Sequence, residues 1–242
     1  MALTVTRLTS ATAGSGSPVV TAAFNIASAG TLVVAAGYET SKTISSVVDS
    51  DANSFTIIKK AIAGGEVECF VAYFLNRSSG NNKTISMTFS GAIAYINYQV
   101  YLISGWSATP EVKADDSSAN GTGTASAAGN ADAIKTESAR IAVVGNYNGE
   151  IYSNPLFGGV AAEGPYPSAD YYCSWYDTWD ASDPGDIDAT ITQAASTGWA
   201  CIQVVFEKAA GAVGGTTTGR ASSSTSRRRN ISKRTGSGLI IL

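Results

Sequence analysis

Apolar residues in the first 208 positions occur in short runs, separated by clusters of Gly, Asn, Asp and Ser. The clearest alternation spans residues 96–102. In a strand, this alternation places Ile96, Tyr98, Val100 and Leu102 on the core face and Asn97, Gln99 and Tyr101 on the opposite face. No long segment has the 3.6-residue period of an amphipathic helix. The pattern therefore predicts an all-β chain of short strands.

Ten segments have the length and apolar content of strands. They are Leu32–Tyr38, Thr43–Val48, Phe55–Lys59, Val67–Leu75, Thr84–Phe89, Ile96–Ile103, Ile141–Val144, Tyr171–Tyr176, Ala189–Thr192 and Ala200–Phe206. Two further strands are expected near the start of the sequence, at residues 3–8 and 19–24. The run Asp49–Asn53 supplies turn-forming residues, which favours a hairpin between the strands on either side of it.

The second half of the sequence echoes the first. Residues 88–104 align without gaps on residues 192–208, and residues 31–38 match residues 140–147. This alignment maps the apolar face of residues 96–102 onto Ala200, Ile202, Val204 and Phe206. We interpret the match as a pseudo-repeat of residues 30–106 and 139–208 within one β-sandwich, residues 1–208. Because a half has too few strands to cover its own apolar face, we expect both halves to share one closed two-sheet sandwich, connected by Asp115–Asp132.

The order of strands and turns resembles that of a β-sandwich module found in virion proteins of tailed phages. The similarity rests on GTLVVAAGYETSKTISSVVDSDANSFTIIKK (30–60), AYFLN (72–76), KTISMTFSG (83–91) and YLISGW (101–106). It covers about residues 28–208 and contains no catalytic motif. The resemblance implies a jelly-roll-like or immunoglobulin-like antiparallel sandwich that serves as a capsid decoration, head-fibre, neck or tail component. Both strand orders are open at this point.

Residues 209–242 differ in composition from the rest, and we call them the C-terminal arm. The preceding residues hold ten of the 16 Lys and Arg and all 19 Asp and Glu, so their net charge is near −9, whereas that of the arm is near +6. An arm rich in Gly, Ser, Thr and Arg cannot bury enough apolar surface to fold alone. We predict an extended arm whose partner-binding residues are Arg227, Arg228, Arg229, Lys233, Arg234, Leu239, Ile240, Ile241 and Leu242.

The arm allows three interpretations. It can be a solvated linker, it can contact nucleic acid through its arginines, or it can lie along a neighbouring subunit with Leu239–Leu242 as an apolar or strand-adding anchor. We favour the third, because the rest of the chain is acidic and the arm contains no aromatic residue. We therefore expect other virion proteins and copies of this chain as partners, and no nucleic acid. Fully extended, the arm reaches on the order of 110 Å.

Composition argues against most enzyme chemistry. The chain contains no His, which removes the usual general base at neutral pH and His-ligated zinc. The three Cys residues form no CxxC pair, so we interpret them as reduced structural thiols. Glu66 and Glu68 share one strand face, but no third acid or sugar-cleft motif accompanies them. We expect a protein without enzyme activity and without a cofactor.

Two segments could bind a ligand. The aromatic cluster around residues 166–179 could stack on sugar rings, with Tyr172, Tyr176, Trp175 and Trp179 as the possible glycan-binding residues. Plain core packing is the competing explanation, although aromatic residues on both strand faces would need a cover. Calcium takes six to eight oxygen ligands, so Asp180, Asp183 and Asp186 are weak metal candidates. The run that begins at Asp49 departs from the EF-hand pattern, because Ser54 replaces the required Gly.

From these observations we predict a non-enzymatic structural or accessory protein of a phage virion, made in the host cytoplasm and attached to the capsid, neck or tail through its C-terminal arm. The alternative is a carbohydrate-binding appendage, such as a tail fibre or an adhesin-like protein, that recognises the host surface. Residues 1–10 lack a basic region followed by an apolar run, and no apolar run approaches the ~20 residues of a membrane span. We therefore expect no secretory leader and no membrane partner.

Overall fold

The computed structural model describes residues 2–13, 16–39, 42–61, 67–106, 109–115, 120–121, 124–127, 137–146, 149, 151–167, 172–179, 188–195 and 198–209. Every regular element among them is a β-strand, and all the strand pairs are antiparallel. The predicted all-β antiparallel sandwich is therefore confirmed. Residues 1–210 form one compact unit, and residues 211–242, which contain most of the C-terminal arm, lie outside the described residues.

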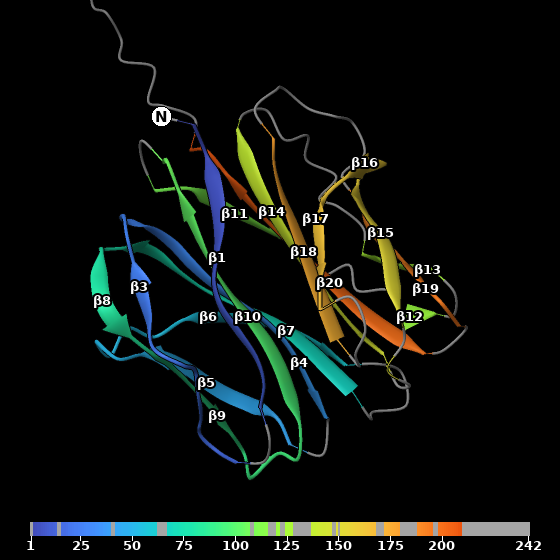
Figure 1. Cartoon of the computed structure of the whole chain (residues 1–242), viewed down its shortest axis with the longest axis horizontal. Helices are drawn as coiled ribbons and strands as arrows, with labels where there is room; N and C mark the ends of the chain where they lie inside the picture. Colours follow the sequence, from blue (N-terminus) through green and yellow to red (C-terminus); the bar gives the residue numbers. More distant parts are fainter. Residues whose placement is uncertain are drawn as a thin grey trace, which may run out of the picture. The chain divides into compact units, whose positions relative to one another are not determined.

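Among the described residues, the first half of the compact unit contains ten strands. The larger sheet has five, in the order β1 (Thr4–Ala13), β10 (Ile96–Ser104), β4 (Gly30–Glu39), β7 (Val67–Arg77) and β6 (Thr56–Ala61). A three-stranded sheet follows the order β2 (Val19–Val20), β9 (Ile85–Phe89) and β5 (Ile44–Asp49), and β3 (Phe24–Ile26) pairs with β8 (Gly80–Lys83). Figure 1 shows β5 and β9 on one side of the sheet that contains β10 and β4.

The second half repeats this plan. Its larger sheet follows the order β11 (Glu111–Asp115), β20 (Trp199–Glu207), β14 (Ser138–Asn146), β18 (Tyr172–Trp179) and β17 (Glu163–Tyr166), and β12 (Asn120–Gly121) also pairs with β20. A smaller sheet follows the order β13 (Thr124–Ala127), β19 (Ala189–Gln193), β15 (Tyr152–Phe157) and β16 (Val160–Ala161). The segment that was expected to be a plain connection therefore contains β12, β13 and the end of β11.

Strand pairing in each half is nested. In the first half, β1 pairs with β10, β2 with β9, β3 with β8 and β4 with β7. In the second half, β11 pairs with β20, β13 with β19 and β14 with β18. Pairing of the first strand with the last, and so on inward, is the order of a rolled-up hairpin. The strand order is therefore that of a jelly roll.

Three apolar cores separate four layers of sheet. The first core lies between the five-stranded sheet of the first half and its two smaller sheets, and it includes Leu32, Phe70 and Met87. The third lies between the two sheets of the second half and includes Phe157 and Trp175. The second core lies between the two larger sheets, where Val33 and Val71 meet residues of β14 and β20.

This layering differs from the single closed two-sheet sandwich expected from the sequence. Each half has its own small sheet, and the two halves pack through their larger sheets. Both faces of β10 are consequently covered, and Asn97, Gln99 and Tyr101 on its second face are buried as well. The alternation in residues 96–102 therefore does not separate a core face from a solvent face.

The structure also corrects the alignment of the two halves. Ile96 and Tyr98 face the core of their own half, whereas Ala200 and Ile202, their partners in the sequence alignment, face the core between the halves. The residues of β20 that face their own half's core are Trp199 and Cys201. The aligned strand is therefore out of register by one residue, which exchanges the two faces of a strand.

The corrected register defines equivalent positions in the two halves. Tyr38 pairs with Ile96, and Asn146 pairs with Trp199, so Tyr38 and Asn146 are equivalent. The same register makes Leu32 equivalent to Arg140 and Gly37 equivalent to Gly145. Along β7 and β18 it makes Phe74 equivalent to Asp177.

Candidate functional site

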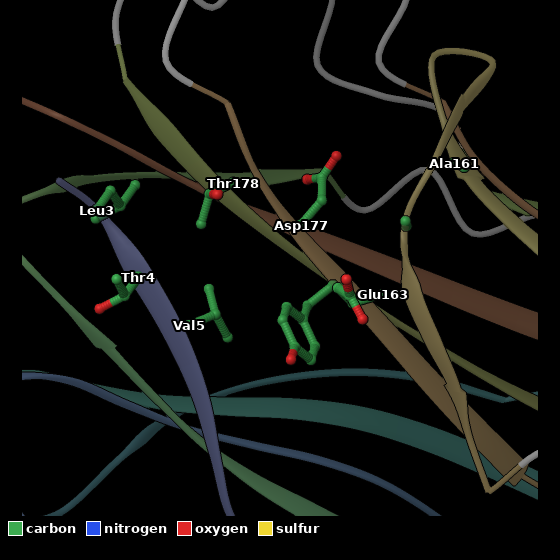
Figure 2. Close-up of a pocket in the computed structure, with 9 residues that line it drawn as sticks. Leu3, Thr4, Val5, Ala161, Glu163, Asp177 and Thr178 are labelled. Atoms are coloured by element: carbon green, nitrogen blue, oxygen red, sulfur yellow. The ribbon is translucent and has the colours of Figure 1, made fainter.

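An open cleft with a volume of about 750 Å³ lies where the beginning of β1 faces the end of β18. Three separate segments line it, each with three consecutive residues: 3–5, 161–163 and 176–178. Figure 2 shows Leu3, Thr4 and Val5 on one side, Ala161 and Glu163 on the other, and Asp177 and Thr178 between them. The cleft thus lies between the first strand of one half, β1, and strands β16, β17 and β18 of the other half.

Strand lengths explain why a cleft forms here. The strand β18 continues to Trp179, but its neighbour β17 begins at Glu163, opposite Tyr176. Residues 177–179 of β18 therefore pair with β14 on one side, and among the described strands none pairs with them on the other side. Within the same described residues, β1 pairs with β10 alone. Two strand edges consequently border the cleft.

The carboxylate of Asp177 is held by a buried arginine. Arg140 Nε donates to Asp177 Oδ1 at 2.7 Å, and Nη2 donates to Oδ2. The guanidinium lies 4.9 Å from the ring centre of Phe157 and 5.3 Å from that of Trp179. Burial raises the pKa of Asp177, and Arg140 opposes this rise. Asp177 is thus part of a structural ion pair, whereas the carboxylate of Glu163 is on an exposed residue.

Aromatic contacts fix the ring of Tyr176 at the base of the cleft. The ring stacks on Tyr166 with centres 6.3 Å apart and meets the edge of Tyr101 at 5.2 Å. Arg7 covers Tyr166 at 4.2 Å, and Tyr101 shares a 2.6 Å hydrogen bond with Ser174. Burial raises the pKa of Tyr176 and of Tyr101. These contacts hold one aromatic ring in the lining of the cleft, beside the polar residues Thr4, Glu163, Asp177 and Thr178.

Burial removes two of the four possible glycan-binding residues from the surface. Trp175 is fully buried, packs on Phe157 and donates its Nε1–H to the carbonyl of Leu156 at 3.4 Å. Tyr172 is buried and stacks on Tyr95. The first half covers one face of β18, and the small sheet of the second half covers the other. Tyr176 and Trp179 retain partial exposure, and Tyr176 alone of the four lines the cleft.

Other predicted residues fall outside the described residues. These are the weak metal candidates Asp180, Asp183 and Asp186, and the arm residues Arg227, Arg228, Arg229, Lys233, Arg234, Leu239, Ile240, Ile241 and Leu242. Among the residues that the structure describes, no three Cys, Asp or Glu side chains are grouped closely enough to hold a metal ion. The described ranges also contain no helix long and apolar enough to cross a membrane.

The predicted turn at Asp49–Asn53 is present, but the predicted hairpin is wrong, because the flanking strands β5 and β6 lie in different sheets and pair with β9 and β7. The turn is held in place by charged side chains. Asp49 Oδ1 accepts hydrogen bonds from the backbone N–H groups of Asp51 and Asn53, both at 2.9 Å. The buried Asp49 Oδ2 lies 2.6 Å from Arg77 Nε, and Asp51 pairs with Arg77 and with Lys83. These carboxylates therefore hold a turn in place, which agrees with the rejection of an EF-hand there.

Glu68 also has an internal role. It is buried and accepts a hydrogen bond from the Tyr38 hydroxyl, which in turn accepts one from the backbone N–H of Ile44 at 3.0 Å. Burial and this carboxylate raise the pKa of Tyr38. Lys59 lies 3.8 Å from Glu68, and Glu66 lies outside the described residues. Cys69, Cys173 and Cys201 are buried reduced thiols outside any disulfide, as the sequence predicted.

Sequence reasoning did not identify the cleft. Its lining comes from residues 3–5 and, more than 150 residues further along the chain, from residues 161–163 and 176–178. The threonines, alanines and single glutamate involved have no distinctive spacing. The one available signal was the aromatic run of β18, which contains Tyr176. Comparison with known proteins does not assign the site either, because no family model, curated protein or solved structure matches the chain.

Proposed function

We propose that this chain is a non-enzymatic structural component of a phage-like virion, attached to the capsid, neck or tail through its C-terminal arm. The observation that carries the proposal is the contrast between the two parts of the chain. Residues 1–210 are compact and acidic, whereas the arm is basic and too poor in apolar residues to fold alone. An attachment segment on a folded body is the simplest use of such a pair.

Two further observations support the proposal. The order of strands and turns over about residues 28–208 resembles that of β-sandwich modules in phage virion proteins. The carboxylates of Asp49, Asp177 and Glu68, and that of Glu137 with Lys208, contribute to internal ion pairs or hydrogen bonds. Those polar groups stabilise the fold. The proposal therefore places the partner contacts on the arm and on other parts of the surface.

The arm and the compact unit carry opposite net charge, so electrostatic attraction should contribute to the attachment. A basic arm on an acidic protein surface gains long-range attraction that steers association. Because a Debye length is about 8 Å at physiological salt, added salt screens this attraction. Attachment should therefore weaken as ionic strength rises.

The test is a deletion of residues 221–242, followed by measurement of incorporation into particles. We expect incorporation to be lost while the far-UV circular dichroism and the melting temperature of the purified protein stay unchanged. Deletion of residues 211–219 is the matched control, because it shortens the arm but keeps its charges and its final apolar residues. Normal incorporation of the 221–242 deletion, with the compact unit still folded, would contradict the proposal.

A carbohydrate-binding appendage is the second candidate, and one observation favours it. Tyr176 lines an open cleft beside the exposed residues Glu163 and Thr178, and such groups can contact a sugar ring and its hydroxyls. A glycan array with the wild type and the variants Tyr176→Ala and Trp179→Ala tests it. Specific binding that both variants lose would favour this candidate over attachment to virion proteins.

A further inference from the structure

We propose that a small pocket between the two halves of the compact unit binds a carboxylate that also carries a hydroxyl group, which is the chemistry of a sugar acid. The pocket has a volume of about 140 Å³ and is open to solvent. None of its lining residues lines the cleft beside Tyr176. The inference goes beyond the proposed attachment function, because it does not involve the C-terminal arm. The lining residues are Arg7, Ser10, Ala11, Asn97, Gln99 and Pro167.

The strand β1 supplies a cation and a hydroxyl group to the pocket. Arg7 pairs with Tyr101 of β10, and Ser10 pairs with Gln99, two residues earlier on β10. A β-bulge at Leu8 accommodates the extra residue of β1. The bulge thereby brings Arg7 and Ser10 to the same face of the sheet. Since Tyr101 belongs to the core between the halves, this is the face that points toward the second half.

The guanidinium group of Arg7 is oriented by an aromatic ring and is not neutralised by an acid. Its Cζ atom lies 4.2 Å from the centre of the Tyr166 ring, so the ring covers one face of the group. No carboxylate of the described ranges lies within ion-pair distance of Arg7. Stacking leaves the in-plane N–H donors at the edge of the group, and their fork matches the two oxygens of a carboxylate.

Gln99 brings a buried hydrogen-bonding group to the same pocket. The residue is 5% exposed, and within the described part of the chain its Oε1 has no hydrogen-bond partner. On its inner side Gln99 borders a gap beside Tyr172 and Cys173 that has no room for a water molecule. A partner must therefore come from the pocket. A hydroxyl group both donates and accepts, so it can pair with either end of the amide.

The second half of the chain shows that the fold does not need these amides. Under the register that relates the two halves, Gln99 is equivalent to Ile202. Its neighbour Asn97 is equivalent to Ala200 in the same way. Both apolar residues are buried in the core between the halves. Because the topology accepts apolar side chains at these positions, the polar ones in the first half indicate a binding role.

Volume and charge restrict the ligand. About 140 Å³ equals the liquid volume of roughly five water molecules, so the pocket has room for one small group. Ala11 and Pro167 add apolar surface that can contact the C–H groups of a sugar ring. Arg7 is the only Lys or Arg in the lining, and the compact unit has a net charge near −9. A singly charged carboxylate therefore suits the site better than a doubly charged phosphate, whose second charge would have no cation.

Isothermal titration calorimetry of the full chain with D-glucuronate tests the inference. We expect glucuronate to bind, and we expect binding weaker by about tenfold or more for two probes. These are D-glucose, which lacks the carboxylate, and cyclohexanecarboxylate, which lacks the hydroxyl groups. Arg7→Ala should weaken glucuronate binding by about tenfold or more. Lys59→Ala is the matched control, because it removes the same charge from an exposed residue outside the pocket, and it should bind as the wild type does.

Gln99→Ile copies the second half and separates a ligand role from a structural one. We expect this variant to lose glucuronate binding and to melt at or above the melting temperature of the wild type, because it removes a buried oxygen that has no partner. A Gln99→Ile variant that melts lower and keeps its glucuronate affinity would assign the amide to the structure and overturn the inference. So would a wild type that does not bind glucuronate, equal affinity for glucose, or undiminished binding by Arg7→Ala.

A free sugar acid and the end of an acidic glycan share this chemistry, and chain length distinguishes them. An oligosaccharide that ends in glucuronate should bind more tightly than the monosaccharide if a glycan is the natural ligand, and no more tightly if a free acid is. Both results retain the site. Particle incorporation of the deletion of residues 221–242 tests the attachment function independently, so failure of either proposal leaves the other standing.

Discussion

The two halves of the compact unit have the same strand order but stabilise equivalent positions by different means. In the first half Leu32 of β4 lies opposite Phe74 of β7, and both pack against the apolar core. In the second half the equivalent pair is Arg140 and Asp177, a buried ion pair. The comparison teaches that the topology does not require either chemistry. What it requires at this position is two side chains of matched size and complementary character.

The largest expected difference in stability comes from replacing the ion pair of the second half by the apolar pair of the first half. Arg140→Leu leaves the Asp177 carboxylate largely buried without its counter-ion, and we expect a loss of about 3–5 kcal/mol in the free energy of unfolding. The double change Arg140→Leu with Asp177→Phe copies the first half, and we expect it to be neutral or to stabilise by about 1–4 kcal/mol. Urea unfolding of the wild type, both single variants and the double variant measures the coupling.

If the double variant is as unstable as Arg140→Leu alone, the ion pair has a role that an apolar pair cannot supply. That result would break the equivalence of the two positions. The matched control is Leu32→Ala at the equivalent position of the first half. This change should lower the free energy of unfolding by about 2–5 kcal/mol, because it creates a cavity.

The contact between the halves brings two equivalent glycines against one tyrosine. A Cβ atom at Gly37 would lie 1.7 Å from Cδ1 of Tyr172, whereas a Cβ atom at Gly145 would lie 2.8 Å from Cγ1 of Val67. We therefore expect Gly37→Ala to destabilise by about 1–3 kcal/mol and Gly145→Ala by less, since a smaller shift relieves its contact. Thermal unfolding of both variants checks the order, and equal effects would contradict it.

The smallest expected difference concerns acid stability. Hydrogen bonds and charge from Lys83 and Arg77 lower the pKa of Asp51 below its usual value of 3.8. Because the folded-state pKa is depressed, the stabilisation is present above that usual value and is lost as pH falls through the lowered one. In the second half Lys208 lowers the pKa of Glu137 in the same way.

Asp51 has two cationic partners and Glu137 has one hydrogen-bonded partner, Lys208. Asp51→Asn should therefore flatten the decline of unfolding free energy below about pH 4 more than Glu137→Gln does. Urea midpoints measured between about pH 3 and pH 6 give the comparison. An unchanged slope in Asp51→Asn would show that this ion pair does not contribute to acid stability.

The ten strands predicted from apolar runs are present, because Gly, Asn and Asp clusters mark the turns between them clearly. The register of the repeat was not predictable in the same way. The identities Gln99/Gln203 and Val100/Val204 favoured an alignment that is out by one residue. Since both faces of β10 and β20 are buried, alternation of polarity could not reveal the error.

The strands that sequence reasoning missed are short or poor in apolar residues. The strand β17 contains Gly164 and Pro165, and β13 consists of small residues, so neither has a strand-like pattern. The candidate cleft depends on where β17 begins relative to β18. A difference in the lengths of two paired strands leaves no mark in local sequence, and for that reason the cleft emerges only from the pairing.

The contact between the two large sheets is itself symmetric. The strand β4 packs on β18 while its equivalent β14 packs on β7, and β10 packs on β18 while β20 packs on β7. This is the reciprocal arrangement of a two-fold dimer, here made within one chain. A dimer of separate halves would dissociate on dilution. Two halves on one chain have a fixed, high effective concentration relative to each other, so dilution does not separate them. The contact between the two jelly rolls should therefore stay intact on dilution of the protein.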